Sequence, residues 1–249
     1  MLYLAKNMKI NNDKIELFNG IALLKDDQCI CRFIRESGRL DHDQNMLPII
    51  ISYIPIGGVV IDIGAFIGDH TIAYAKKVGQ SGKVIAYEPS KDAFDCLRHN
   101  IKDFTHIIGV NCMALGSEKK IVPIEIVGGN NGMNFIPKGI INANIDNEKY
   151  ESKVVVKTMD DSLCEIQKID FIKIDVEGYE LDVLIGGKQT INKFKPIMLI
   201  EINDATLSRQ GISRNDIFAW LQENNYIYRN IYENQGLNDS QLDIICTAI

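Results

Sequence analysis

Apolar segments of strand length alternate with segments of helical periodicity from about residue 57 onward. Five of them are short and mostly continuous in their apolar character, as buried parallel strands require: 59–63, 83–87, 107–114, 171–174 and 198–202. The stretches between them are long enough to hold crossover helices, which parallel neighbours need. This alternation predicts an α/β fold around a parallel sheet.

The end of the chain departs from the alternation. Segments 226–232 and 242–249 both read as strands, and a short polar loop without helical periodicity joins them. We therefore expect them to pair antiparallel, which gives a mostly parallel seven-stranded sheet with an antiparallel C-terminal hairpin. That arrangement is typical of the Rossmann-like class I methyltransferase fold, whereas nicotinamide-dependent dehydrogenase domains normally stay parallel throughout. Segments 121–127 and 153–156 are expected to form an additional strand pair.

Residues 1–56 precede this pattern and are expected to form a short N-terminal extension to a domain over 57–249. Segments 14–17 and 28–34 read as strands, and Asn19-Gly20 is a hairpin signal between them. A helix is expected to begin near Asp41 or Asp43. The extension has two open roles, as a cover over the active site or as the contact surface of a homodimer.

Charge and cysteine content narrow the function classes. The chain has 27 Lys and Arg against 33 Asp and Glu, a formal net charge of −6 without a basic run, which argues against a nucleic-acid partner. Its six cysteines lack CxxC spacing and are expected to be reduced thiols. Since neither a signal peptide nor a membrane-spanning segment is visible, we expect a soluble, cytoplasmic protein.

A glycine-containing turn follows the first strand of the sheet. In Asp62-Ile63-Gly64-Ala65-Phe66-Ile67-Gly68-Asp69-His70-Thr71, Gly64 permits a tight turn and Gly68 a close approach of the backbone to a ligand. The middle glycine of the dinucleotide fingerprint is missing, because Phe66 and Ile67 stand in that region. The turn therefore suits a ligand without a pyrophosphate.

The second strand ends in Glu88-Pro89-Ser90. An acidic group at this place can accept hydrogen bonds from both hydroxyls of a ribose. Ser90 is expected to cap the next helix. Met113 and Ala114, near the end of the third strand, would pack against an adenine ring.

Four blocks together resemble the FkbM-type methyltransferase family: residues 60–71, 86–89, 174–180 (Ile-Asp-Val-Glu-Gly-Tyr-Glu) and 183–187. The resemblance covers roughly residues 58–232 and implies S-adenosylmethionine as cofactor, with Asp62 near its methionine moiety. Members usually have Asn where this chain has Phe66. The candidate cofactor-binding residues are Asp62, Gly64, Ala65, Phe66, Gly68, Thr71, Glu88, Pro89, Ser90, Met113, Ala114 and Asp175.

Polar residues at the ends of the fourth and fifth strands are candidates for the chemistry. Asp175, Glu201 and Asn203 could converge at the carboxyl edge of the sheet, where open α/β sheets bind ligands. They would either form an oxygen site for Mg²⁺ or, without metal, bind substrate hydroxyls, with Asp175 or Glu201 as a base. His70 and His42 are further candidate bases.

The family resemblance implies O-methylation of a sugar hydroxyl, on a free sugar, a nucleotide-linked sugar or a glycan. Three alternatives stay open: N-methylation of an amino sugar or small metabolite, a nicotinamide-binding oxidoreductase, and a non-catalytic module that keeps the cofactor fold. The Gly- and Asn-rich segment 128–137 is expected to be a substrate-facing loop.

Overall fold

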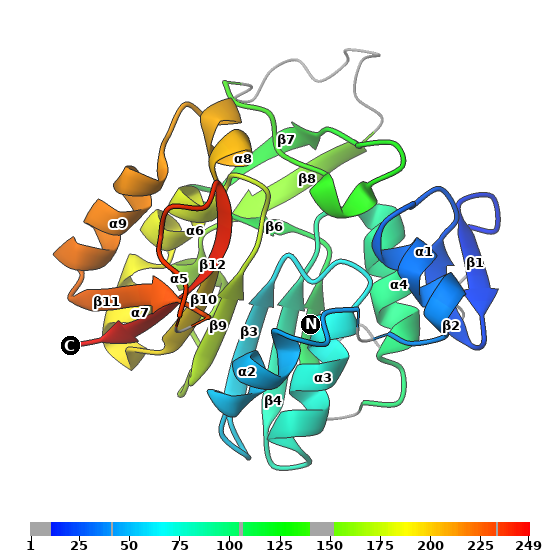
Figure 1. Cartoon of the computed structure of the whole chain (residues 1–249), viewed down its shortest axis with the longest axis horizontal. Coiled ribbons are helices and arrows are strands. Elements are labelled where there is room, and N and C mark those ends of the chain that lie inside the picture. The colour runs from blue at the N-terminus through cyan, green and yellow to red at the C-terminus, as the bar shows by residue number, and fades with distance from the viewer. Residues whose placement is uncertain (1–10, 41, 105–106, 140–151, 233) are drawn as a thin grey trace.

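The computed structural model describes residues 11–40, 42–104, 107–139, 152–232 and 234–249. A central seven-stranded sheet has the order β11-β12-β10-β9-β3-β4-β5 (Figure 1). Its strands are β3 Val59–Ile63, β4 Lys83–Tyr87, β5 Ile107–Asn111, β9 Phe171–Ile174, β10 Ile197–Asn203, β11 Tyr226–Asn230 and β12 Gln241–Ala248. β12 runs antiparallel to both of its neighbours, β10 and β11, and the other pairs are parallel. The predicted sheet with its antiparallel hairpin is confirmed.

Helices cover both faces of this sheet: α3 Asp69–Val78, α4 Lys91–Asn100, α5 Met159–Ser162, α6 Glu180–Gly186, α7 Lys188–Phe194, α8 Asp204–Arg209 and α9 Arg214–Glu223. Successive residues of a strand point to opposite faces. Ile61 accordingly packs in the core that contains Trp220 of α9, and Val60 in the core that contains Tyr74 of α3. Helix α9 begins at a capping box that Ser213 and Asp216 form.

The N-terminal extension contains the hairpin β1 Ile15–Phe18 and β2 Ile21–Leu24, followed by α1 Ile30–Ser37 and α2 Leu47–Ser52. The predicted strand over 28–34 is wrong. Cys31 and Ile34 lie three residues apart and are both buried, which is the spacing of a helix face. The Asp27 carboxylate accepts hydrogen bonds from the amides of Cys29 and Cys31 and so supports the first turn of α1.

A small second sheet lies above the carboxyl edge of the main one (Figure 1). Its strands are β6 Ala114–Leu115, β7 Lys120–Ile124 and β8 Ser152–Lys157, in the order β6-β8-β7. The predicted pair is confirmed as β7 and β8, and the expected strand over 107–114 is divided into β5 and β6. Within the described part of the segment between β7 and β8, residues Asn131–Met133 form the short helix η1.

All six cysteines are unpaired, as expected. Over the ranges that the structure describes, none of the helices has the length and apolar character needed to cross a membrane.

Candidate active site

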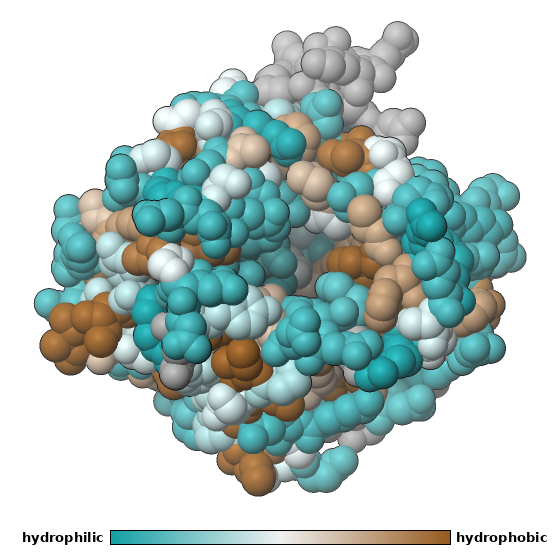
Figure 2. All heavy atoms as spheres, viewed as in Figure 1, coloured by the Kyte–Doolittle hydropathy of each residue, from teal (hydrophilic) through white to brown (hydrophobic). Residues whose placement is uncertain are grey.

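A cavity of about 330 Å³ opens at the carboxyl edge of the main sheet, next to the N-terminal extension and η1. Figure 2 shows the hollow near the middle of this face, with both hydrophilic and hydrophobic residues around it. The predicted site residues that line it are His42, Gly64, Ala65, Phe66, His70, Glu88, Pro89, Met113, Ala114, Asp175 and Glu201. Asn130–Ile136 also line it, so the expected loop lies at the cavity.

The glycine turn after β3 is shaped by a close contact with the chain after β9. Gly64 has a φ of +82°, and a Cβ there would lie 1.7 Å from the carbonyl oxygen of Asp175. Phe66 also adopts a left-handed backbone, with a φ of +47°, which costs a non-glycine residue free energy. Its side chain packs with Ile15, Leu24 and Ile34 of the extension. The residue that departs from the family pattern thus joins the turn to the extension.

Four predicted cofactor residues lie behind the cavity wall and do not line it. A Cβ at Gly68 would lie 2.7 Å from Leu97 Cδ1, so the close approach at this glycine is to α4 and not to a ligand. The Thr71 hydroxyl donates to Asp62 Oδ2 at 2.5 Å, and both residues are buried. The fourth, Ser90, stands at the N-cap position of α4, but its side chain makes no capping hydrogen bond. These residues hold the turn in place.

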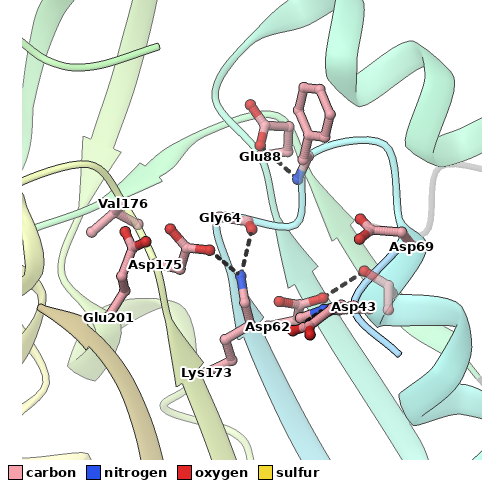
Figure 3. A network of polar contacts seen from close by, with 12 residues as sticks. Asp43, Asp62, Gly64, Asp69, Glu88, Lys173, Asp175, Val176 and Glu201 are labelled. Atoms are coloured by element: carbon pink, nitrogen blue, oxygen red, sulfur yellow. Dashed lines mark hydrogen bonds and ion pairs between the residues drawn. The ribbon is translucent and has the colours of Figure 1, made fainter. Parts of the chain in front are cut away.

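Glu88 reaches the cavity with its carboxylate fixed at both oxygens. Oε2 accepts from the amide of Phe66 at 2.9 Å (Figure 3). Oε1 accepts from the amide of Ser90 at 2.7 Å. Burial raises the pKa of Glu88 to about 7, although the two amide hydrogen bonds favour the ionised form. The remaining lone pairs are free to accept from a ligand.

Lys173 is a functional candidate that the sequence analysis missed. Its ammonium donates to Asp175 Oδ2 at 2.9 Å and to the carbonyl of Gly64 at 3.1 Å (Figure 3). Burial disfavours the charge, but the carboxylates of Asp175 and Asp62 outweigh it, so the pKa of Lys173 is raised. A lysine within the otherwise apolar strand β9, which is buried on both faces, was the signal available in the sequence.

Three carboxylates gather beside Lys173. Oxygens of Asp175, Glu177 and Glu201 lie within 4.8 Å of one another. The charge of Asp175 raises the pKa of Glu201 to about 10, and burial raises that of Glu177 to about 8. Neighbouring Glu180 has a structural role, because its Oε1 accepts from the amides of Val176 and Gly178.

Asn203 does not join this group as the expected metal set required. It is the last residue of β10, and the chain enters α8 directly after it. Its Oδ1 accepts from the amide of Ala205 at 3.1 Å and so caps α8, and Asn203 does not line the cavity. Glu177 lies next to Asp175 and Glu201 instead.

Both candidate histidines lie in one cluster. His42 Nδ1 lies 2.9 Å from Asp69 Oδ2, His70 Nε2 lies 3.9 Å from Asp43 Oδ2, and the two rings stack with centroids 5.7 Å apart. Burial lowers the pKa of His42, but the contact with Asp69 outweighs it and the net shift is upward. Burial lowers the pKa of His70. The extension thus supplies two of the four side chains.

Comparison with known families identifies the family to which the fold and its glycine turn belong. A family model described as "Methyltransferase FkbM domain" matches residues 62–228, which include the glycine turn, Glu88, Lys173 and the carboxylate cluster.

This chain belongs to the FkbM methyltransferase domain family.

Curated relatives of this FkbM-family chain include "Hexuronic acid methyltransferase AglP" of Haloferax volcanii, 25% identical over 187 residues, which are 73% of this chain and 68% of the relative. "Methyltransferase 1" of Beauveria bassiana is 26% identical over 153 residues, 55% of this chain and 61% of the relative. The crystal structure of "Methyltransferase FkbM" from Methylobacillus flagellatus KT superposes with a TM-score of 0.52 at 18% identity. The aligned part covers 76% of this chain and 43% of the Methylobacillus chain.

These findings confirm the class I methyltransferase fold and the family expected from the sequence. The aligned parts span about three fifths to two thirds of the curated relatives and less than half of the crystallised chain. The FkbM-family fold places the acidic residue after β4, the glycine turn after β3 and Asp175 after β9 around a single cavity. The ligands that bind in that cavity are proposed below.

Proposed function

We propose that this FkbM-family protein is an S-adenosylmethionine-dependent O-methyltransferase that acts on a sugar hydroxyl. The observation that carries the proposal is the position of the Glu88 carboxylate. Two backbone amides hold it at the carboxyl end of β4, inside the cavity that the glycine turn also lines. A fixed carboxylate with free lone pairs fits the two hydroxyls of a ribose.

The residues around Glu88 fit the rest of the cofactor. Met113, Ala114 and Leu115 supply apolar surface for an adenine ring, and the turn over Gly64–Phe66 supplies backbone without space for a pyrophosphate cradle. Asp62 is buried beneath the turn and acts by holding it through Thr71. When bound, S-adenosylmethionine would supply the methyl group.

Asp175 is the residue that we propose to bind the acceptor hydroxyl and to take its proton. It lines the cavity directly against the glycine turn. Lys173 keeps it ionised, because the ammonium lowers the pKa of Asp175 although burial opposes this. The name of the Haloferax relative supports a sugar acceptor, and the polar side chains of Asn130, Asn131 and Asn134 line the cavity where such an acceptor would enter.

Mg²⁺ fits the carboxylate cluster poorly. Lys173 already neutralises Asp175 at 2.9 Å, Glu201 Oε1 accepts from the Gln241 side chain at 2.9 Å, and the third expected ligand, Asn203, is turned away. We therefore propose that these carboxylates serve the acceptor without Mg²⁺.

N-methylation of an amino sugar is the second candidate, and the charge of the cavity favours it. Among the described residues that line the cavity, acidic side chains predominate, and Lys173 is the single lysine or arginine. The acidic lining residues are Asp43, Asp69, Glu88, Asp175, Glu177, Glu201 and Asp243. A cationic amine would relieve the repulsion that raises the pKa of Glu201. An anionic acceptor would be repelled by the same carboxylates.

We also propose that residues 57–249 form the cofactor-binding domain and that the described part of the extension over residues 1–56, namely 11–40 and 42–56, covers the cavity. Ile30, His42, Asp43 and Met46 of the extension line the cavity wall. This placement favours the covering role over that of a surface reserved for a homodimer.

The proposal is tested first by calorimetric titration with S-adenosylhomocysteine, with NAD in parallel. We expect micromolar binding of S-adenosylhomocysteine alone. Glu88→Ala should weaken it about 100-fold or more, because two charge-assisted hydrogen bonds are lost. Glu118→Ala, which changes an exposed glutamate outside the cavity, is the matched control. Preferential binding of NAD, or unchanged affinity in Glu88→Ala, would refute the assignment.

The acceptor is then identified by incubating the protein and labelled S-adenosylmethionine with neutral, amino and acidic sugars. Methylation of a neutral sugar supports the first candidate, and methylation of an amino sugar supports the second. Binding of the cofactor without transfer to any acceptor class would favour the non-catalytic alternative.

A further inference from the structure

The histidine cluster brings together side chains from two separate parts of the chain. His42 and Asp43 belong to the N-terminal extension, and Asp69 and His70 begin α3. Nitrogens of both histidines and an oxygen of Asp69 all lie within 4.8 Å of one another, and Asp43 Oδ2 lies 3.9 Å from His70 Nε2. Asp69 and His70 are the more buried members, with exposed side-chain fractions of 7% and 12%, and the fractions for Asp43 and His42 are 19% and 28%.

Two nitrogens in this cluster are buried without a hydrogen-bond partner. These are His42 Nδ1 and His70 Nε2, the same two atoms that face the carboxylates. His42 Nδ1 lies 2.9 Å from Asp69 Oδ2 and forms an ion pair with it when the ring is protonated, whereas His70 Nε2 lies 3.9 Å from Asp43 Oδ2. Buried polar atoms of this kind are costly unless something binds them. Their shared direction points to a ligand between the rings and the carboxylates.

The other ring nitrogen of His70 has a partner. Tyr74, one turn further along α3 and fully buried, places its hydroxyl 3.4 Å from His70 Nδ1. Metal-binding histidines characteristically use one nitrogen for the ion and give the other to a supporting hydrogen bond. Tyr74 supplies that support and leaves Nε2 directed at the cluster.

We propose that His42, Asp43, Asp69 and His70 bind a divalent transition-metal ion, of the class of Zn²⁺, Fe²⁺ or Mn²⁺. Two imidazoles with two carboxylates are a donor set that suits these ions and not Mg²⁺ or Ca²⁺, which prefer oxygen alone. Metal–ligand bonds of about 2 Å require the donor atoms to draw together by about 1 Å. The site is distinct from the carboxylate cluster at Asp175, and its occupation does not depend on the proposed methyl transfer.

The ion would fasten the extension to the domain. Within this part of the chain, His42 and Asp43 follow the helix α1 and precede α2, whereas Asp69 and His70 lie directly after the glycine turn. Because the four residues come from both sides, binding stabilises the arrangement in which the extension covers the cavity. His42, Asp43, Asp69 and His70 all line that cavity, so a free coordination position would face the acceptor.

The experiment uses the full-length protein, stripped with a chelator and titrated with Co²⁺ as the probe and then with Zn²⁺. We expect one Co²⁺ per chain, an intensified visible absorption from nitrogen ligation, and a rise in melting temperature that Zn²⁺ reproduces. His70→Gln and Asp69→Asn should each weaken binding about 100-fold, and Tyr74→Phe about 10-fold, as expected for a supporting residue.

Controls separate this site from its neighbours. Glu201→Gln changes the carboxylate cluster, and His99→Gln changes a histidine whose ring lies against Gly20 outside the cavity. Both should bind Co²⁺ as the unmodified protein does. Circular dichroism and titration with S-adenosylhomocysteine show that each variant is folded, independently of metal. The proposal is overturned if the unmodified protein binds no Co²⁺, if Glu201→Gln abolishes binding, or if His70→Gln retains it.

Discussion

Phe66 meets two opposing physical demands. Its left-handed backbone, with a φ of +47°, favours glycine or asparagine. Its ring, only 8% exposed, packs against the β-hairpin and α1 of the extension. In this chain the apolar contact outweighs the backbone cost, because burying a phenyl ring contributes about 3 kcal/mol and the strain costs about 1 kcal/mol.

Phe66→Asn should therefore destabilise the protein by about 2 kcal/mol, the difference between the lost contact and the relieved strain. Phe66→Leu, which keeps most of the apolar contact, should cost less. Urea denaturation measures both. A stabilised Phe66→Asn variant would mean that backbone strain dominates at this position.

Glu88 should make cofactor binding depend on pH. Its pKa is about 7 in the ligand-free protein, because burial disfavours the charge, and under the proposed assignment the ionised form would accept the two ribose hydroxyls. Affinity for S-adenosylhomocysteine should fall about tenfold per pH unit below about 7 and level off above it. Calorimetry across this range measures the effect. Glu88→Gln should bind weakly at every pH, and a pH-dependent response in that variant would assign the titration to another group.

At the scale of elements, α1 depends on a single arginine. Arg35 donates to Glu16 of β1 at 2.5 Å, to the carbonyl of Leu24 at 2.5 Å and to that of Asp27 at 3.0 Å. It thereby joins the hairpin, the connecting turn and the helix. Arg32 on the same helix makes an exposed ion pair with Glu36, one turn along α1.

Arg35→Ala should lower the free energy of local opening of the extension by about 2 kcal/mol, since three hydrogen bonds from a charged group are lost. Hydrogen exchange should accelerate over residues 15–37 and not in the central sheet. Arg32→Ala is the matched control and should change the opening by less than about 0.5 kcal/mol. Equal protection in both variants would show that apolar packing alone holds the extension.

The whole molecule carries an excess of buried carboxyl groups. Burial raises the pKa of Glu88 and of Glu180 from 4.5 to about 7, and that of Asp243 to about 7. The folded protein therefore holds protons that the unfolded chain releases from about pH 4.5 upward. Each such group contributes stability at low pH that is lost as the pH rises towards 7.

Thermal stability of the ligand-free protein should thus decline between about pH 5 and about pH 7, because over this range these groups keep their protons in the folded protein and lose them in the unfolded chain. His42 and His70 shift in opposite directions and partly offset each other, whereas the low pKa of Asp69, about 2, acts only in stronger acid. Scanning calorimetry across this range tests the sign. A melting temperature that rises from pH 5 to 7 would contradict the predicted protonation of these groups.

Much of the fold followed from local patterns in the sequence. The parallel strands and the terminal hairpin are encoded in runs of neighbouring residues, and each was placed within a few residues. The strand prediction for residues 28–34 was wrong because a short apolar run fits both strand alternation and helical spacing. The buried residues that pack around Cys31 and Ile34 decide in favour of the helix.

The sequence alone determined the mostly parallel sheet with its antiparallel hairpin, the glycine turn and the acidic residue after the second strand, because these depend on residues adjacent in the chain. Only the tertiary structure decided that Lys173 pairs with Asp175, that Asn203 caps a helix, and that the extension brings His42 to His70. These depend on which distant segments meet and on which buried charges must then be neutralised. Short-range periodicity does not predict such long-range contacts, since they arise from packing across the whole molecule.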